Sequence, residues 1–196
     1  MNTTSVSRFR PFARIVSAVL LLVVGVGAST GRTSPGDDGF KATTVYLVRH
    51  AEKAATPPAD PPLLDAGNAR AQALARTLAR AGIKTVFTSQ YLRTRQTAEP
   101  LARQLGLTPS VVPVRMDTMS SRELDPKYLE EMVRRVHAAA GENILIVGHS
   151  NTVPALIKAL GGDVVPTISE SEYDDLFIVT VVAKGKARVA HLKQQL

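Results

Sequence analysis

Apolar and polar residues follow a repeating order from Thr44 onward, in which short β-branched runs alternate with helical periods. In three segments apolar residues recur every three or four positions, which predicts amphipathic helices, and a glycine and a short apolar run follow each of them. We therefore expect strands at 44–48, 84–87, 110–114 and 143–147, and helices around 71–78, 98–105 and 129–136. A shorter helix at 153–160 and two strands at 176–183 and 187–192 complete the predicted elements.

Strands that alternate with helices are typical of a sheet that is covered by helices. The last two strands flank Lys184-Gly185-Lys186 and predict a hairpin, which adds an antiparallel edge. The predicted fold class is therefore α/β, a three-layer sandwich with a mostly parallel sheet. Asp65 is the expected cap of the first helix, and Asp125 followed by Pro126 predicts the start of the third.

The first 28 residues have the pattern of a secretory leader. A polar, basic stretch over 1–14 precedes an apolar run over 15–27, and Val26-Gly27-Ala28 supplies small residues for cleavage. We expect a signal peptide at 1–28, a flexible linker at 29–42 and one folded domain at 43–196. Export to the periplasm or beyond the cell follows from this interpretation. An uncleaved leader, which would anchor the domain to the membrane facing outside, is the alternative.

Composition excludes several kinds of chemistry. The 196 residues contain no cysteine, so disulfides, thiolate metal sites and cysteine nucleophiles are ruled out. The formal charge is +7, but three arginines lie in the leader, so the chain from Ser29 onward has 21 basic and 17 acidic residues, or +4. A mildly basic surface with 5% aromatic residues does not favour nucleic-acid binding, and it is compatible with a small anionic substrate.

Chemistry-bearing residues follow three of the expected strands, at the edge where parallel α/β sheets bind ligands. They are Arg49-His50 after the first strand, Thr88-Ser89 leading to Arg93 after the second, and Gly148-His149-Ser150 after the fourth. Two imidazoles and two guanidinium groups at one edge would repel each other unless an anion lay between them. A phosphoryl group suits this site, because guanidinium groups bind its oxygens in pairs and the N-terminus of the following short helix is partly positive.

These segments resemble the histidine phosphatase superfamily, also called phosphoglycerate mutase-like. Three motifs in the family's order carry the resemblance, Leu47-Val48-Arg49-His50-Ala51-Glu52-Lys53, the segment from Thr88 to Ala98, and Val147-Gly148-His149-Ser150-Asn151. The resemblance covers about residues 44–192 and includes Pro62-Leu63-Leu64 with Gly67, which is similar to the family's link before its first helix.

The resemblance implies a phosphomonoester hydrolase of the phosphoglycerate mutase-like fold that acts on a small phosphorylated substrate. His50 would attack phosphorus and form a covalent phosphohistidine, which water then hydrolyses. Arg49, Arg93 and His149 would hold the nonbridging oxygens, and Ser150 and Asn151 would complete the substrate-binding set. No metal or other cofactor is required.

Other interpretations of the same residues are weaker. Arg95 lies two residues beyond Arg93 on the expected helix and should face elsewhere. His137 and His191 are expected at the surface or in packing. Ser150 lacks the second glycine of a hydrolase elbow and is expected to cap the short helix instead. A metal site at the two strand-end histidines is disfavoured, because the neighbouring arginines would repel a divalent cation.

The proton donor for the leaving group remains open at the level of sequence. The resemblance favours Asp117, which follows the third expected strand by a few residues. Four other carboxylates are alternatives, Glu52, Glu123, Asp174 and Asp175.

Transfer of the phosphoryl group to a second hydroxyl would make a mutase rather than a phosphatase. Water is favoured as acceptor, because the chain between Ala98 and Gly148 is taken up by a strand and a helix and has no room for a large lid. A protein that binds phosphate without turnover is a third hypothesis. The acidic loop over 169–175 would favour simple monoesters over highly charged substrates if it borders the site.

Overall fold

The computed structural model describes residues 41–114, 124–163 and 167–195. The expected signal peptide and nearly all of the expected linker lie outside these residues, as do Asp117 and Glu123. Within the described part of the chain, no helix is both long and apolar enough to cross a membrane.

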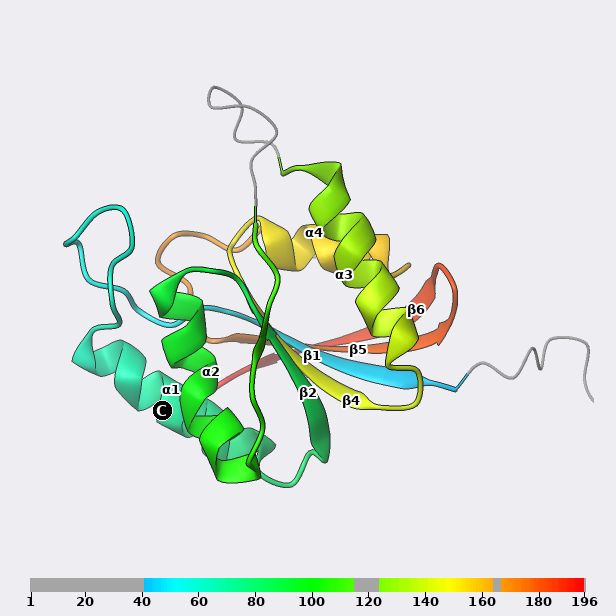
Figure 1. The fold of residues 1–196 in the computed structure, drawn as a ribbon, viewed down its shortest axis with the longest axis horizontal. Coiled ribbons are helices and arrows are strands. Elements are labelled where there is room, and N and C mark those ends of the chain that lie inside the picture. Colours follow the sequence, from blue (N-terminus) through cyan, green and yellow to red (C-terminus); the bar gives the residue numbers. More distant parts are fainter. Residues whose placement is uncertain (1–40, 115–123, 164–166, 196) are drawn as a thin grey trace, which may run out of the picture. The chain divides into compact units, whose positions relative to one another are not determined.

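A mixed sheet of six strands forms the centre of the domain (Figure 1). The strand order is β3-β2-β4-β1-β5-β6; the first four are parallel, and β5 and β6 form the antiparallel edge. The α/β prediction is thus confirmed. The elements in chain order are β1 (Thr43–Arg49), α1 (Asp65–Leu78), β2 (Ile83–Thr88), α2 (Leu92–Leu105), β3 (Ser110–Val111), α3 (Pro126–Ala138), β4 (Asn143–Gly148), α4 (Thr152–Ala159), β5 (Asp175–Ala183) and β6 (Lys186–Lys193).

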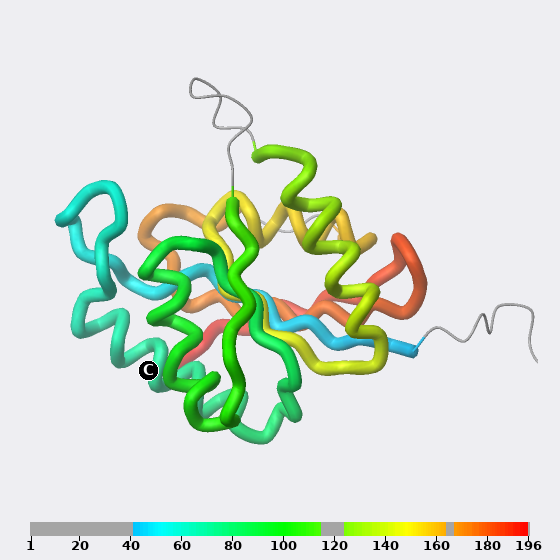
Figure 2. Tube along the Cα trace, viewed as in Figure 1, coloured from blue at the N-terminus to red at the C-terminus, as the bar shows by residue number. Residues whose placement is uncertain are grey.

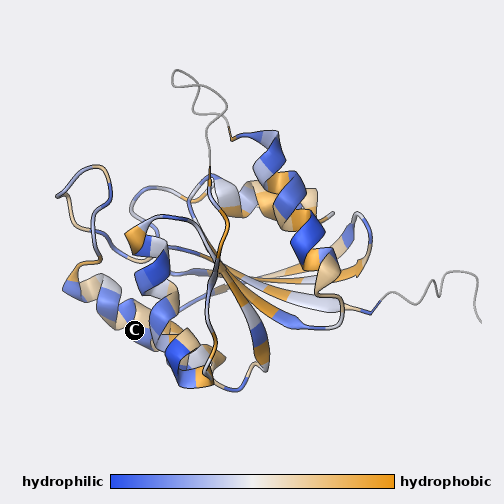
Figure 3. Cartoon of the chain, viewed as in Figure 1, coloured by the Kyte–Doolittle hydropathy of each residue, from blue (hydrophilic) through white to orange (hydrophobic). Residues whose placement is uncertain are grey.

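Two helical layers cover the two faces of this sheet. Helices α1 and α2 lie on one face and α3 and α4 on the other (Figure 1). Neighbouring residues of one strand enter opposite cores: Leu47 packs with the α3 and α4 side chains, whereas Val48 packs with those of α1 and α2. Hydrophobic residues, shown in orange, accordingly lie on the strands and on the sides of the helices that face them (Figure 3).

Three local expectations are wrong. Asp65 is the first helical residue of α1 and not its cap, which is Leu64, without a side-chain capping bond. The expected strand 110–114 stops after Val111; Pro113 has no N–H to continue a ladder, and the Gln90 side chain pairs with the backbone of Val114 instead. Ser150 does not cap α4, whose N-cap is Asn151.

Register brings the ends of the central strands level with one another. Arg49 of β1 pairs with Gly148 of β4, and Thr88 of β2 pairs with Val147. His50 and His149 each come one residue after these pairs, so the backbone alone sets the two histidines side by side. Figure 2 shows the segments that follow these strands, in cyan, green and yellow, at the same end of the sheet as the orange segment before β5.

Candidate active site

His50 is held in one orientation by the backbone around it. Its amide donates to the Gly148 carbonyl at 2.9 Å, and its ring Nδ1 lies 2.8 Å from the Ala51 carbonyl oxygen. Because a carbonyl only accepts, Nδ1 carries the proton, and Nε2 keeps its lone pair. The side chain is 3% exposed. This is the tautomer that a nucleophile attacking through Nε2 requires.

His149 lies against His50, with the ring centroids 5.4 Å apart and the planes inclined at 66°. Its Nε2 lies 3.0 Å from Ser89 Oγ, which is 2.9 Å from Thr94 Oγ1. The Thr94 hydroxyl donates to the Tyr91 carbonyl, so Ser89 donates to Thr94 and accepts from His149 Nε2. A chain of hydroxyls therefore fixes the second imidazole.

Both imidazoles are neutral at physiological pH. Burial lowers the pKa of His50 to about 4, with help from the charges of Arg93 and Arg49 and against the hydrogen bond to Ala51. Burial and then the charge of Arg93 lower the pKa of His149 to about 3. Arg49 acts on both rings and Arg93 on both, so the four side chains form one electrostatic unit.

The two arginines of this unit differ in their surroundings. Arg49 is 2% exposed and donates from one terminal nitrogen to the carbonyls of Ser169 at 2.6 Å and Glu172 at 2.9 Å. Arg93 stacks on the Tyr91 ring at 4.2 Å and lies 3.9 Å from the Asp60 carboxylate. Within the described residues, the Nε atom of each arginine is buried and has no hydrogen-bond partner. These two N–H groups are donors that a bound anion would satisfy.

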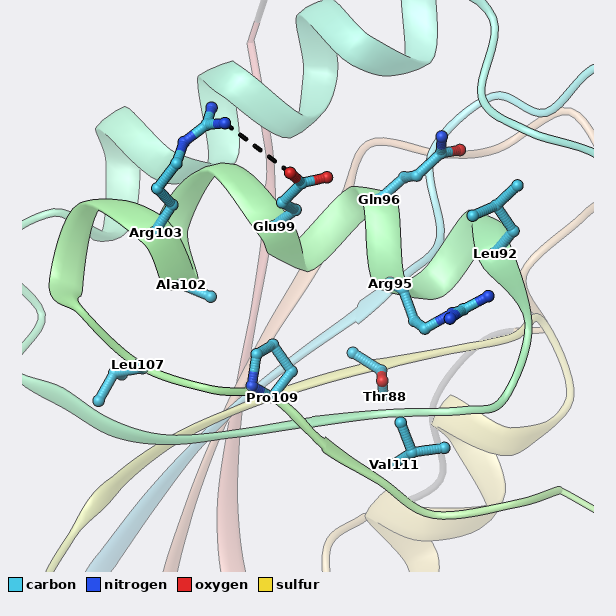
Figure 4. Close-up of a pocket in the computed structure, with 10 residues that line it drawn as sticks. All are labelled: Thr88, Leu92, Arg95, Gln96, Glu99, Ala102, Arg103, Leu107, Pro109 and Val111. Atoms are coloured by element: carbon cyan, nitrogen blue, oxygen red, sulfur yellow. Dashed lines mark ion pairs between the residues drawn. The ribbon is translucent and has the colours of Figure 1, made fainter.

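Arg95 faces a different part of the molecule. It lines a cavity of about 400 Å³ between α2 and the segment 107–111 and points toward Thr88 and Val111 (Figure 4). Neither histidine lines this cavity. The placement separates Arg95 from Arg93, as the helical spacing predicts.

Three of the five carboxylates considered as proton donors lie within the described residues, and each of these three binds a basic side chain. Burial opposes ionisation of Glu52, but the bidentate bonds from Arg70 at 2.6–3.0 Å outweigh it and hold its pKa below the ordinary value. Asp174 and Asp175 both bind Lys193 on β6, at 3.0 Å and 2.7 Å. Asp117 and Glu123 lie outside the described residues.

Three other residues at the site were not anticipated individually. The Glu170 carboxylate binds Arg49 Nη2 at 2.8 Å and accepts from Ser150 Oγ at 3.0 Å, and Tyr173 stacks on Arg49 at 4.3 Å. Asp60 accepts from the amide of Leu92 at 2.8 Å and so satisfies the first N–H of α2, whose N-cap residue Tyr91 makes no capping bond of its own. All three come from irregular segments, where periodicity gives no position. The acidic loop over 169–175 indicated the region of Glu170 and Tyr173, and nothing in the sequence indicated Asp60.

The arrangement is suited to binding a tetrahedral anion next to a nucleophile. The buried Arg49, the partly buried Arg93 and the hydrogen-bonded imidazole of His149 lie around His50, whose Nε2 is unprotonated. Among the described residues, no three His, Cys, Asp or Glu side chains are grouped so that they could hold a metal ion.

Comparison with known proteins agrees with this geometry. The profile of the "Histidine phosphatase superfamily (branch 1)" matches residues 45–119, which include Arg49, His50 and Arg93. This part of the chain is similar to that superfamily. His149 lies beyond the matched residues, so its assignment to the site rests on the register of β1 and β4.

The individual proteins that this chain resembles are distant in sequence. The chain is 27% identical over 160 residues to GpmB of Yersinia pestis, a phosphoglycerate mutase by name, covering 60% of this chain and 74% of that one. A 54-residue stretch, 27% of this chain, is 48% identical to the PE-PGRS family protein PE_PGRS11 of Mycobacterium tuberculosis, and it spans 9% of that protein's length. The structure of the protein histidine phosphatase SixA complexed with tungstate superposes with a TM-score of 0.60 at 19% identity, over 76% of this chain and 96% of that one. The superfamily thus includes phosphatases and phosphoglycerate mutases.

Proposed function

We propose that this protein is a phosphomonoester hydrolase that works through a covalent phosphohistidine on His50. One observation carries the proposal: His50 Nδ1 donates to the Ala51 carbonyl, so Nε2 is free to attack, beside two arginines whose buried Nε groups have no hydrogen-bond partner within the described residues. SixA, a neighbour in fold, is a protein histidine phosphatase whose structure contains tungstate, a tetrahedral oxyanion.

The proposed reaction has two displacements. His50 Nε2 forms a bond to phosphorus while the bond to the ester oxygen breaks, and a carboxylic acid protonates that oxygen as it leaves. Water then attacks phosphorus while the carboxylate left by the first step takes a proton from it; the P–N bond breaks, and inorganic phosphate, neutral His50 and the carboxylic acid are formed. Arg49, Arg93 and His149 would hold the nonbridging oxygens throughout. A bound phosphoryl dianion favours protonation of His149, which then donates from both ring nitrogens.

Asp117 is our proposed proton donor. The chain passes from Val114 toward Asp117 while Gln90 binds both the N–H and the C=O of Val114, at 2.9 Å each. Gln90 directly follows Ser89, the partner of His149. The segment that carries Asp117 therefore begins next to the site. Glu52, by comparison, is ionised by Arg70, and a group with a lowered pKa is a poor acid.

Water is the proposed acceptor of the phosphoryl group. Phosphoglycerate mutase activity is the second candidate, because the relative from Yersinia pestis carries that name. A mutase has to keep water from its intermediate, and only 37 residues lie between α2 and β4, of which 15 belong to β3 and α3, which leaves little chain for a large lid. Assay of 3-phosphoglycerate for isomerisation and for phosphate release separates the two reactions.

Release of p-nitrophenol from p-nitrophenyl phosphate tests the proposal. We expect His50→Ala to lower kcat by at least about a thousandfold, since the nucleophile is lost. His137→Asn is the matched control, because this histidine lies on α3 outside the site, and it should leave kcat unchanged. Equal activity of His50→Ala and the wild-type protein would refute the nucleophile, and phosphate binding without turnover would favour a binding protein.

Export of the domain also stays a proposal. It rests on the apolar run 15–27 and the small residues at 26–28. Cell fractionation and N-terminal sequencing of the full chain expressed in a bacterium test it: a mature end near residue 29 supports cleavage, and an intact, membrane-bound chain supports the anchor.

A further inference from the structure

The segment before β5 covers one of the two arginines of the site. The carbonyls of Ser169 and Glu172 accept from one terminal nitrogen of Arg49, and the Glu170 carboxylate accepts from the other. The Glu170 side chain is 80% exposed, whereas Arg49 is 2% exposed. The loop thus keeps its backbone contacts to Arg49 while the carboxylate lies at the solvent side.

Glu170 also interacts with residues of the site other than Arg49. Its second oxygen accepts from Ser150 Oγ, the residue after His149. Its charge interacts with that of Arg93 as well. Burial opposes ionisation, but Arg49 and the Ser150 hydroxyl outweigh it and keep the pKa of Glu170 below its ordinary value. Glu170 is therefore an anion at neutral pH and not a reserve of protons.

The Glu170 carboxylate affects how a second anion, the phosphoryl group of a substrate, binds at the site. The phosphoryl group of a substrate needs the same Arg49, and it carries up to two negative charges of its own. The Nε groups of Arg49 and Arg93 have no hydrogen-bond partner within the described residues, whereas Arg49 Nη2 is shared with Glu170. The carboxylate neutralises part of the positive charge before the substrate arrives, and it repels phosphate groups placed next to the reacting one.

Taking the proposed phosphatase activity as its basis, we propose that Glu170 is a specificity-determining residue, an internal anion that competes for Arg49, weakens phosphate binding and selects monophosphate esters over polyphosphorylated ones. In the same way, the Asp60 carboxylate 3.9 Å from Arg93 reduces the charge on the other side of the site. Weak binding of free phosphate would also speed product release.

Glu170→Gln tests this inference, because the amide keeps the shape and removes the charge; its oxygen can accept from Arg49, and its nitrogen can donate to Ser150 Oγ. We expect the Kd for inorganic phosphate, measured by calorimetry, and the KM for p-nitrophenyl phosphate to fall by about three- to tenfold at low ionic strength. The difference should shrink to less than about twofold in about 1 M salt, where the Debye length is near 3 Å. A merely structural role of Glu170 would not produce this salt dependence.

A second arm compares substrates. The ratio of kcat/KM for phytate to that for p-nitrophenyl phosphate should rise at least about threefold in Glu170→Gln. Glu99→Gln is the control, because it removes one negative charge from the exposed face of α2, where Glu99 pairs with Arg103. It should leave both the phosphate Kd and the substrate ratio unchanged.

The outcomes separate this inference from the proposed function. Hydrolysis that depends on His50, with the same phosphate Kd in Glu170→Gln and the wild-type protein, would refute the role of Glu170 alone. Tighter phosphate binding by Glu170→Gln without any hydrolysis would support the role of Glu170 and refute the phosphatase. If neither protein bound phosphate and neither hydrolysed p-nitrophenyl phosphate, both would be wrong.

Discussion

At the scale of single residues, the site depends on the protonation of two buried histidines. Desolvation disfavours the imidazolium ion, and the two arginines add to this effect, so both rings stay neutral until the solution is strongly acidic. A neutral His50 is a nucleophile, whereas a protonated one is not. The arginines therefore serve catalysis before any substrate binds.

Burial and the neighbouring arginines determine the pH at which His50 gains its second proton. Because its pKa is lowered to about 4, the neutral ring should persist from pH 7 down to about pH 5 and be lost as the pH falls through about 4. Titration of the imidazole nitrogens by NMR measures this, and it reports Nδ1 as the protonated nitrogen in the neutral ring. A midpoint near 6.5, the ordinary value for histidine, would contradict the electrostatic account.

The role of Asp117 can be isolated through the leaving group. p-Nitrophenol leaves readily without a proton, whereas the alkoxide of glycerol phosphate does not. Asp117→Asn should lower kcat for glycerol phosphate by about a hundredfold or more and that for p-nitrophenyl phosphate by less than about tenfold. Glu123→Gln should lower neither. Equal losses on the two substrates for Asp117→Asn would assign Asp117 a role other than general acid.

At the scale of elements, one glycine sets how α1 meets the segment after His50. A Cβ atom at Gly67 would collide with the Glu52 carbonyl oxygen, which also accepts from the Leu64 amide at 2.9 Å. Glu52 is two residues from His50. The close approach of α1 therefore supports the backbone that carries the nucleophile.

Gly67→Ala should consequently affect both stability and activity. We expect a loss of about 2–4 kcal/mol in the free energy of unfolding, because the colliding atom is backbone and the helix has to move. Gly106→Ala is the comparison: Gly106 caps α2 with φ of 66° and has open space around it. It should cost about 1 kcal/mol from the left-handed backbone alone and leave kcat unchanged. Urea denaturation and the p-nitrophenyl phosphate assay measure both.

The sequence predicts the helices and strands well where apolar residues recur regularly. It predicts them poorly where a side chain, and not a neighbouring strand, forms hydrogen bonds with the backbone. The three helices and central strands follow from their spacing of apolar residues, and Asp125 caps α3 as expected by accepting from the Lys127 amide. β3 was overestimated, because the sequence does not reveal that Gln90 takes over the pairing with Val114. The bond from the first amide of α2 to Asp60 could not be predicted, since Asp60 lies 32 residues away in the chain.

At the scale of the whole domain, the parallel order β2-β4-β1 is what assembles the site. Parallel strands in register end at the same level, so residues that follow them meet even though His50 and His149 are far apart in sequence. This rule made the meeting of the strand-end residues predictable. This rule did not predict Glu170, because Glu170 belongs to an irregular segment that contacts to Arg49 and Ser150 hold in place.

The central claim is that this assembly transfers a phosphoryl group to His50. Brief exposure of the protein to p-nitrophenyl phosphate, rapid denaturation at alkaline pH and mass spectrometry of the peptides tests it most directly. We predict one added phosphoryl group on the peptide that contains His50, and its absence in His50→Ala. Hydrolysis of the substrate with His50 unmodified, or a phosphoryl group on another residue, would contradict the account.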